Sequence, residues 1–431
     1  MRGRRFRGVL ICVILSLFAT KAAGAHAYIV STQPAMNGSY PTLNGSIAVS
    51  FDEPISILNS DALQLDDDTG RRVDRRNAHV DPQDATRVVV DVPQNLAPGL
   101  FTVRWRVISA DTHVVHGSYQ IGVGMQLNAI KRSRESSPFD PASALPSVLR
   151  ALSLLGALLV AGALVLDRLV LRELRPSSSD AEMIARRAAL IGAALVLVAA
   201  LPSLLVQAAA VSGHIGGAIV PTLESRWGTA WAVRVASALV LLLVIALAWR
   251  RRATAAVLLA VGGLLVSFSI SGHALAVSGS ARIAAFVMDF AHIVTSAVWI
   301  GGVFVLAPIV YAQRRLAPSL FARFTPLAIG SVVVIVVSGT YAAIVHVGTF
   351  ADLLGTAYGR ILLLKISLVA ILLLFGYHHL RIGRGRGSDV GPDTIGYEAL
   401  VGLSVVALTA VLIGQMLPMH MPGMADTSMG R

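Results

Sequence analysis

Hydrophobic and polar positions divide the chain into two parts with different periodicities. In the first part, apolar side chains occupy every second position of GLFTVRWRVIS, residues 99–109, namely Phe101, Val103, Trp105 and Val107. Such alternation predicts a β-strand with one buried face. Further short runs, separated by Pro, Gly, Asn and Asp, predict more strands in SIAVSFDEPI, DALQLDDD, TRVVVDV and GSYQIGVG. This spacing of short strands and turns is typical of an antiparallel, immunoglobulin-like β-sandwich.

The second part consists of long apolar runs, each long enough to cross a hydrocarbon core of about 30 Å. They cover residues 147–171, 186–211, 229–249, 254–276, 283–311, 325–346, 361–380 and 396–417. The predicted fold is therefore mixed: an all-β sandwich is followed by an all-α polytopic bundle of about eight transmembrane helices.

Composition and charge agree with a protein of the lipid bilayer. The 431 residues are 55% apolar and only 14% charged, which a water-soluble core does not explain. The formal charge of +12 comes from arginines that gather in every second loop between the apolar runs. Because basic loops stay on the cytoplasmic side, we expect the sandwich and the C-terminus to lie outside. Nucleic acid is not an expected partner.

The first 25 residues have the features of a signal peptide. A basic start and an apolar run lead to the small residues Ala23, Gly24 and Ala25, so cleavage would make His26 the first residue. Cleavage would also remove Cys12, the only cysteine. The alternative is an uncleaved signal anchor. The expected organisation is then a signal peptide (1–25), the sandwich (26–124), a polar linker (125–146), the membrane domain (147–417) and a tail (418–431).

Three residues of the predicted sandwich are candidate ligands of Cu(II). An N-terminal His26 offers its α-amino and imidazole nitrogens, and Asp111 and His113 share one face of an extended segment. Three nitrogens and one carboxylate oxygen suit the tetragonal geometry of Cu(II). Zinc is an alternative metal, with a tetrahedral arrangement. The structural alternative is that Asp111 and His113 merely cap a strand end.

Ionisable residues within the apolar runs indicate a metal path through the bundle. A run that enters the bilayer near Arg282 places Asp289 about 10 Å deep and His292 about 15 Å deep. Such residues normally face the bundle interior and mark ion or proton routes. Asp289, His292 and Trp299 recur at i, i+3 and i+10, and one helical face can present them together. As an alternative, Asp289 is a structural counter-ion of Lys365 or Arg234.

Further candidate ligands lie on the side predicted to face outward. His214 and His273 occur at the outer ends of apolar runs, and either imidazole could instead bond to a backbone carbonyl. In the tail, thioethers and an imidazole suit Cu(I), at Met416, Met419, His420, Met421 and Met424. The alternative is a disordered tail without bound metal.

Two stretches of the sequence resemble known families. HAYIVSTQPAMNGS, SFDEPI and VRWRVISADTHVVHGSYQIGVG resemble the periplasmic copper-binding CopC domain. The resemblance implies Cu(II) binding by His26 and by the Asp and His of the SxDxH motif, Asp111 and His113. The small residues usual after that motif are replaced by Val114 and Val115, and His116 is added. We expect His116 to be an ordinary surface residue; the alternative is a spare ligand.

The helical part resembles CopD, through SGHA, DFAHIVTSAVWIGG, SGTYAA and TAYGRILLLK. A CopC/CopD fusion implies copper handling and copper import at the cytoplasmic membrane. A periplasmic copper chaperone would be a further partner.

We therefore expect a copper importer without enzymatic activity. No GxxxxGK[ST] loop occurs in the sequence, so a nucleotide is not the expected source of energy. The membrane potential contributes about 2.3 kcal/mol per charge per 100 mV to inward cation movement. Two alternatives remain open. One is a haem-bearing membrane oxidoreductase, which needs axial ligands at matched depth, whereas the inner side offers only the adjacent His378 and His379, which point different ways. The other is a copper sensor or store that does not transport.

Overall fold

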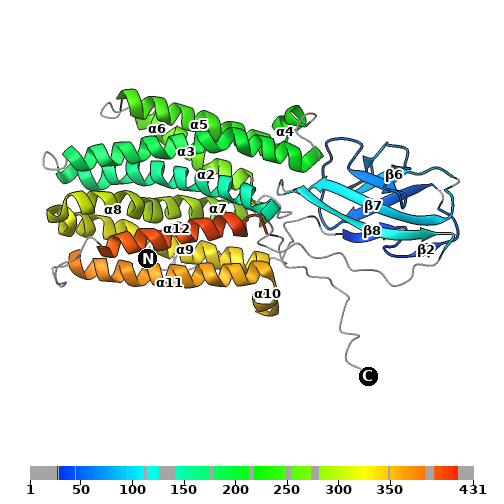
Figure 1. Ribbon diagram of the computed structural model, residues 1–431. Coiled ribbons are helices and arrows are strands. Elements are labelled where there is room, and N and C mark those ends of the chain that lie inside the picture. The colour runs from blue at the N-terminus through cyan, green and yellow to red at the C-terminus, as the bar shows by residue number, and fades with distance from the viewer. Residues whose placement is uncertain are drawn as a thin grey trace, which may run out of the picture.

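The structure, a computed structural model of the chain, contains a β-sandwich and a helical bundle placed end to end (Figure 1). The residues that it describes are 27, 29–43, 45–94, 96–110, 112, 114–125, 141–174, 179–212, 218–248, 254–272, 281–347, 350–383 and 393–415.

The sandwich consists of two four-stranded sheets, in the orders β1-β3-β6-β5 and β2-β8-β7-β4. Only the β2–β8 pair is parallel among the described pairs; the others are antiparallel. The strands are β1 (Ile29–Gln33), β2 (Ser39–Tyr40), β3 (Ser46–Phe51), β4 (Leu63–Asp66), β5 (His79–Asp81), β6 (Asp84–Asp91), β7 (Gly99–Ile108) and β8 (Val114–Val123).

The alternation predicted for β7 sets the position of the sandwich core. Phe101, Val103 and Val107 are buried, and Arg104 on the opposite face is exposed. The five strands expected from the sequence are confirmed as β3, β4, β6, β7 and β8. The patterns do not predict β1, β2 and β5, because two of these strands have three residues or fewer and β1 has no regular alternation.

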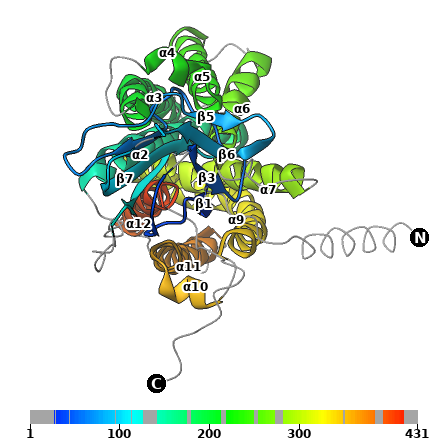
Figure 2. The same ribbon diagram turned by 90° about the vertical axis from the view of Figure 1, so that its right-hand side faces the viewer.

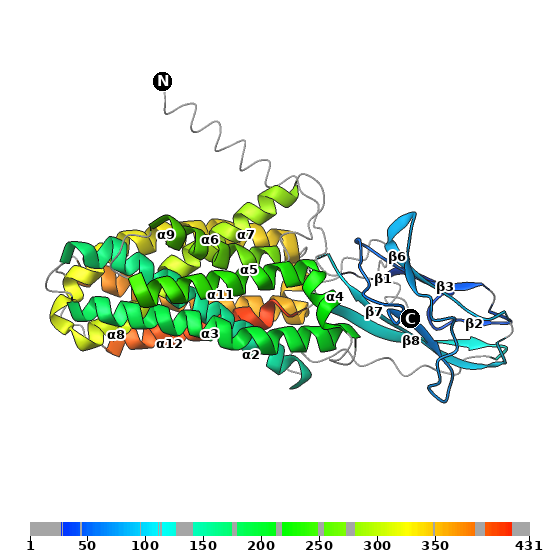
Figure 3. The same ribbon diagram turned by 90° about the horizontal axis from the view of Figure 1, so that it is seen from above.

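The bundle contains long helices that run between its two ends (Figure 3), together with the six-residue helices α4 and α10. Its helices are α2 (Pro141–Val165), α3 (Ser179–Ser212), α4 (Ile219–Glu224), α5 (Arg226–Ala248), α6 (Thr254–Ile270), α7 (Ala281–Ser296), α8 (Gly302–Ala312), α9 (Ala317–Val347), α10 (Phe350–Gly355), α11 (Ala357–Gly383) and α12 (Asp393–Leu412). Short π or 3₁₀ segments continue or join them: η1 (Leu166–Val170), η2 (Leu171–Leu174), η4 (Ala297–Gly301) and η5 (Arg314–Leu316).

Each predicted apolar run contains a helix, and seven helical spans of the described chain are long and apolar enough to cross a membrane. The eighth, α6, is apolar but shorter. Helix α2 begins at Pro141, inside the segment expected to be a linker, because proline is well suited to the first turn of a helix. Many large apolar side chains face outward from the bundle, among them Leu247, Leu259 and Leu374.

One end of the bundle contacts the sandwich. Ala110, which follows β7, packs against a buried cluster formed by Val347, Tyr358, Ile361 and Leu412. The start of α11 and the end of α12 therefore lie beside the sandwich (Figure 1), and the view along the long axis shows the sandwich in front of the helices (Figure 2). The end of α11 and the start of α12 lie at the opposite end of the bundle.

Candidate functional site

Most of the predicted metal ligands lie outside the described residues. These are His26, Asp111 and His113 of the sandwich, His214 and His273 of the bundle, and Met416, Met419, His420, Met421 and Met424 of the tail. Among the residues that are described, no group of three or more His, Cys, Asp or Glu side chains could hold a metal ion. The ligand predictions consequently stay predictions. The structure describes residues next to several of these candidates in the chain, and their contacts are given below.

The loop between β7 and β8 is held against the bundle on both sides of Asp111. Arg226 of α5 donates a hydrogen bond to the carbonyl oxygen of Ala110. Gln207 of α3 donates one from Nε2 to the carbonyl oxygen of Thr112, at 3.4 Å. The Thr112 hydroxyl in turn donates to the carbonyl oxygen of Ser271, at 3.5 Å. Three segments of the bundle thus touch the residues next to the candidate ligands.

The backbone of this loop has an uncommon conformation. Thr112 has a φ of 72°, in the left-handed region that β-branched residues rarely adopt. Its amide donates to the carbonyl oxygen of Ser109 at 2.9 Å, and the Ala110 amide donates to Oε1 of Glu53 at 3.0 Å. Such conformations persist where surrounding contacts fix them, and they cluster at functional sites. Thr112 lies between Asp111 and His113 in the sequence.

A cavity of about 570 Å³ separates the sandwich from the bundle at this loop. Its walls carry polar groups from both parts, including Ser109 and Thr112 of the sandwich and Gln207, Glu224 and Arg226 of the bundle. Val211, which precedes the segment containing His214, also lines it. We call this space the interface cavity. It is the place where the sandwich loop and one end of the bundle meet.

Asp289 and His292 lie on α7 and are partly buried in the bundle. Nδ1 of His292 lies 3.0 Å from the hydroxyl oxygen of Ser338 on α9. Lys365 of α11 interacts electrostatically with both Asp289 and His292. These residues form what we call the outer polar cluster.

Arg234, the other counter-ion considered for Asp289, has partners on α6. Its guanidinium donates to the Ser267 hydroxyl at 3.1 Å and to the Ser271 hydroxyl at 3.2 Å. It also lies 4.1 Å from the ring centroid of Phe268. Of the two basic residues, Lys365 is therefore the one that the structure brings into interaction with Asp289.

Trp299 is buried in the π-helical segment η4, where the helix that begins as α7 changes its periodicity. A π turn places side chains at a different spacing from an α-helix. The single face predicted from i, i+3 and i+10 therefore does not extend unchanged from Asp289 to Trp299. Trp299 instead lines a second cavity of about 250 Å³ between α8, α9, α11 and α12, which opens at the surface of the bundle beside the exposed side chains of Val333 and Tyr377.

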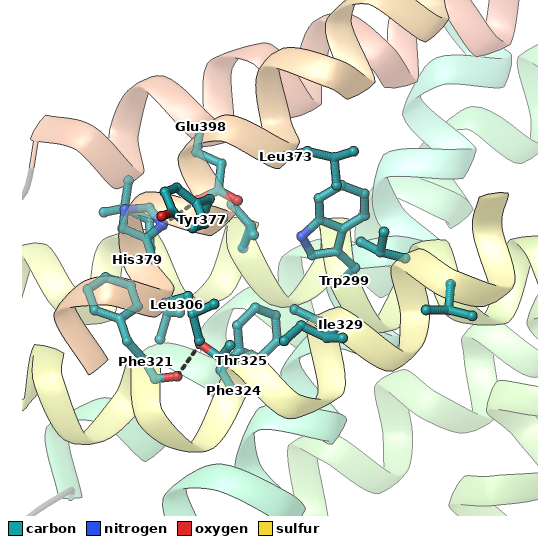
Figure 4. A pocket seen from close by; sticks show the side chains of 17 residues that line it. Trp299, Leu306, Phe321, Phe324, Thr325, Ile329, Leu373, Tyr377, His379 and Glu398 are labelled. Atoms are coloured by element: carbon teal, nitrogen blue, oxygen red, sulfur yellow. Dashed lines mark hydrogen bonds and ion pairs between the residues drawn. The ribbon is translucent and has the colours of Figure 1, made fainter. Parts of the chain in front are cut away.

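This second cavity contains a buried acid–base pair (Figure 4). Nδ1 of His379 lies 2.9 Å from Oε2 of Glu398, and both residues are almost fully buried. The His379 ring stacks on Phe321, with ring centroids 4.5 Å apart. The sequence prediction overlooked Glu398. Its signal was an ionisable residue within the apolar run 396–417, the same signal that identified Asp289.

Comparisons with known proteins cover both parts of the chain. The CopC domain family matches residues 29–124. The family described as copper resistance protein D-like, N-terminal domain, matches residues 142–283, and the copper resistance protein D family matches residues 318–413. The copper transport protein CutJ of Bacillus subtilis (strain 168) is 25% identical over 429 residues, which are 95% of this chain and 77% of CutJ. The chain is a CopC/CopD fusion.

Other relatives of the fusion match its sandwich. Protein YobA of Escherichia coli (strain K12) is 26% identical over 113 residues, 26% of this chain and 90% of YobA. CopC from Methylosinus trichosporium OB3b is 23% identical and covers 24% of this chain and 100% of its own, with a TM-score of 0.21. PcoC from Escherichia coli is 24% identical and covers 23% of this chain and 98% of its own, with a TM-score of 0.19.

The fusion thus joins a CopC domain to a helical CopD domain, and its relative CutJ is a copper transport protein. The predicted family and the predicted mixed fold are confirmed.

Proposed function

We propose that the CopC/CopD fusion captures Cu(II) outside the cytoplasmic membrane and moves copper inward through its bundle, without catalysing a covalent reaction. One observation carries this proposal. The residues on both sides of Asp111, Ala110 and Thr112, are bonded to the end of the bundle by Arg226 and Gln207. A copper ion held by His26, Asp111 and His113 would therefore sit at the entrance of the helical domain.

The charges of the described helices support an orientation with the sandwich outside. Arg168 and Arg323 lie at the end opposite the sandwich, where Arg323 pairs with Glu173. Gln313 and Asp180, which are 3.3 Å apart, join two more helix termini at that end. Positively charged loops remain in the cytoplasm, so copper released at that end would enter the cell. The large apolar side chains around the bundle would then face lipid.

The outer polar cluster is the first candidate step inside the bundle. Asp289 supplies a carboxylate and His292 an imidazole, groups that both coordinate copper. The Ser338 contact holds the His292 ring in place. A cation that moves inward through this cluster gains about 2.3 kcal/mol per charge per 100 mV of membrane potential.

Lys365 favours a second candidate function, a copper store or sensor that does not transport. Its ammonium group interacts with both Asp289 and His292, and it would repel a copper ion at this position. In that case the Asp289–Lys365 pair would be structural, and the bundle would serve as an anchor. Copper flux through the reconstituted protein distinguishes the two functions.

The test is copper uptake by proteoliposomes that contain the full chain, with the double variant Asp111→Ala/His113→Ala. We expect the wild type to show saturable uptake driven by an inside-negative potential, and the variant to need about 10-fold or more copper for the same rate. His116→Ala is the matched control, because His116 is an exposed histidine on β8 opposite Arg106. Absence of uptake by the wild type would refute transport. Equal uptake by the double variant would refute capture at this loop.

A further inference from the structure

The bundle contains a second buried polar site, far from the sandwich, that the capture loop and the outer polar cluster do not include. Tyr358 lies beside the sandwich, and His379 follows it on α11 by about twenty residues, or about 30 Å at 1.5 Å per residue. Glu398 faces His379 from the first turns of α12. The pair therefore lies near the end of the bundle that carries the basic helix termini. We call it the inner site.

Burial of the His379–Glu398 pair costs free energy, so the inner site needs compensating interactions. His379 is 5% exposed and Glu398 is 2% exposed. A carboxylate removed from solvent needs a hydrogen bond and a compensating positive charge. The 2.9 Å contact with Nδ1 of His379 supplies the hydrogen bond. On the other side of the ring, Nε2 lies 3.4 Å from the Thr394 hydroxyl oxygen.

A cavity beside α9 and α11, open at the bundle surface, extends from Trp299 to the inner site. Trp299 lines it together with Thr325, Val333, His379 and Glu398. Figure 4 shows Trp299 at the end of this cavity away from His379. Trp299 follows His292 by seven residues, which is about 10 Å along a helix. The cavity therefore begins about two helical turns beyond the outer polar cluster and ends at a carboxylate and an imidazole.

We propose that His379 and Glu398 form the inner copper site of the route, where an ion that has passed Trp299 is held before release. The proposal rests on the import function proposed above. The ion would take the place of the His379–Glu398 hydrogen bond, with the imidazole and the carboxylate as its protein ligands. Nitrogen and oxygen ligands of this kind suit copper, and the carboxylate compensates positive charge within the bundle.

The small number of ligands suits a site of passage. An ion is conducted only where binding is favourable enough for entry and weak enough for exit. Two protein ligands bind more weakly than the complete ligand sets of structural metal sites. Most of the cavity lining is apolar, as at Phe324 and Ile329, and its further side-chain oxygens are the neutral hydroxyls of Thr325 and Tyr377. Phe321 keeps the His379 ring in position by stacking.

The experiment compares Glu398→Gln and His379→Gln with the wild type in proteoliposomes supplied with copper alone. We expect uptake to fall about 10-fold or more in both variants. We also expect purified Glu398→Gln protein to bind one copper ion fewer per chain. His378→Gln is the matched control, because His378 is the adjacent histidine and is exposed. This control should keep both the uptake and the copper content of the wild type.

Different outcomes separate the inner site from the function on which it depends. If the wild type takes up copper and Glu398→Gln has the same uptake and the same copper content, the inner site is overturned and import stands. If the wild type shows no uptake, import fails, and equal copper content in Glu398→Gln and wild type would then also overturn the inner site. Should both variants of the pair fail to fold, Ala328→Phe decides, because Ala328 lines the cavity. Unchanged uptake with the cavity filled would overturn the proposal.

Discussion

At the scale of single residues, Asp74 shows how the sandwich holds a buried charge. Its carboxylate accepts hydrogen bonds from Nε of Arg72 at 2.7 Å, from the Leu65 amide at 2.9 Å and from the Arg76 amide at 2.7 Å. Burial alone would raise the pKa of Asp74, but these donors together lower it below its usual value of 3.8. The folded sandwich therefore favours the ionised form more than the unfolded chain does.

The lowered pKa of Asp74 predicts a loss of stability in acid. Its contribution is present above the unfolded pKa, near 4, and is lost as the pH falls through the lower pKa of the folded state. We expect Asp74→Asn to reduce the free energy of unfolding at pH 7 by about 2 kcal/mol.

Urea unfolding of the sandwich segment alone measures this change. The segment is suitable because its buried residues form a core of their own, made only of residues between Ala27 and Val123. The difference between Asp74→Asn and the wild type should shrink below pH 4. Asp68→Asn, which changes an exposed carboxylate, should have little effect. A constant difference down to pH 2 would contradict the proposed cause.

Single residues can be singled out from the sequence where one run of the chain contains the signal. Asp289 and His292 stand out because they are ionisable and lie in an apolar run. Glu398 carries the same signal. The meeting of α7 with α11, which brings Lys365 to Asp289, depends on tertiary packing and has no local signal. The sequence could therefore propose Lys365 as a partner but could not choose between Lys365 and Arg234.

At the scale of elements, glycines let two segments of the bundle approach closely. A Cβ atom at Gly162 of α2 would collide with the backbone of Gly301 in η4, and one at Gly301 would collide with the Leu158 carbonyl oxygen. The π-helical segment that carries Trp299 is therefore packed backbone to backbone against α2. Small residues at helix interfaces in membranes have this effect in general.

This packing predicts that Gly301→Val destabilises the bundle by about 2 kcal/mol or more, because the backbone atoms that it meets cannot move away easily. Thermal unfolding of the full chain in detergent measures the change. Gly262→Val is the control, since a Cβ atom there has no heavy atom within 4 Å. Equal unfolding temperatures for the two variants would show that the close approach is unimportant for stability.

The elements themselves were predictable to different degrees. Long apolar runs and the strict alternation of β7 correspond directly to helices and a strand. The π-helical form of η4 was not predictable, because it depends on the fit to α2 rather than on a local pattern. The parallel pairing of the two-residue strand β2 with β8 has no sequence signal for the same reason.

At the scale of the whole molecule, the contacts of Arg226 and Gln207 predict that one variant can keep Cu(II) binding by the sandwich and lose copper transfer to the bundle. We expect the double variant Arg226→Ala/Gln207→Ala to bind Cu(II) at the sandwich as the wild type does, because neither residue is a proposed ligand. Copper uptake should fall by about 10-fold, since the loop would no longer be held over the bundle.

Electron paramagnetic resonance of bound Cu(II) and uptake by proteoliposomes provide the two measurements. Thr229→Ala, an exposed change on the same helix as Arg226, is the control. An unchanged uptake rate would show that the contacts with Ala110 and Thr112 have no part in transfer. This docking was not predictable from the sequence, because the residues that meet are separated by about a hundred positions.

The interface cavity restricts what can reach the β7–β8 loop from outside. With about 570 Å³ between sandwich and bundle, it has room for a hydrated ion but not for another folded domain. A soluble donor protein could touch the loop only after the sandwich had tilted away and broken the contacts of Ala110 and Thr112. Copper loading by such a donor and copper delivery into the bundle would then require two different positions of the sandwich. The donor could not be bound to the loop while the ion enters the bundle.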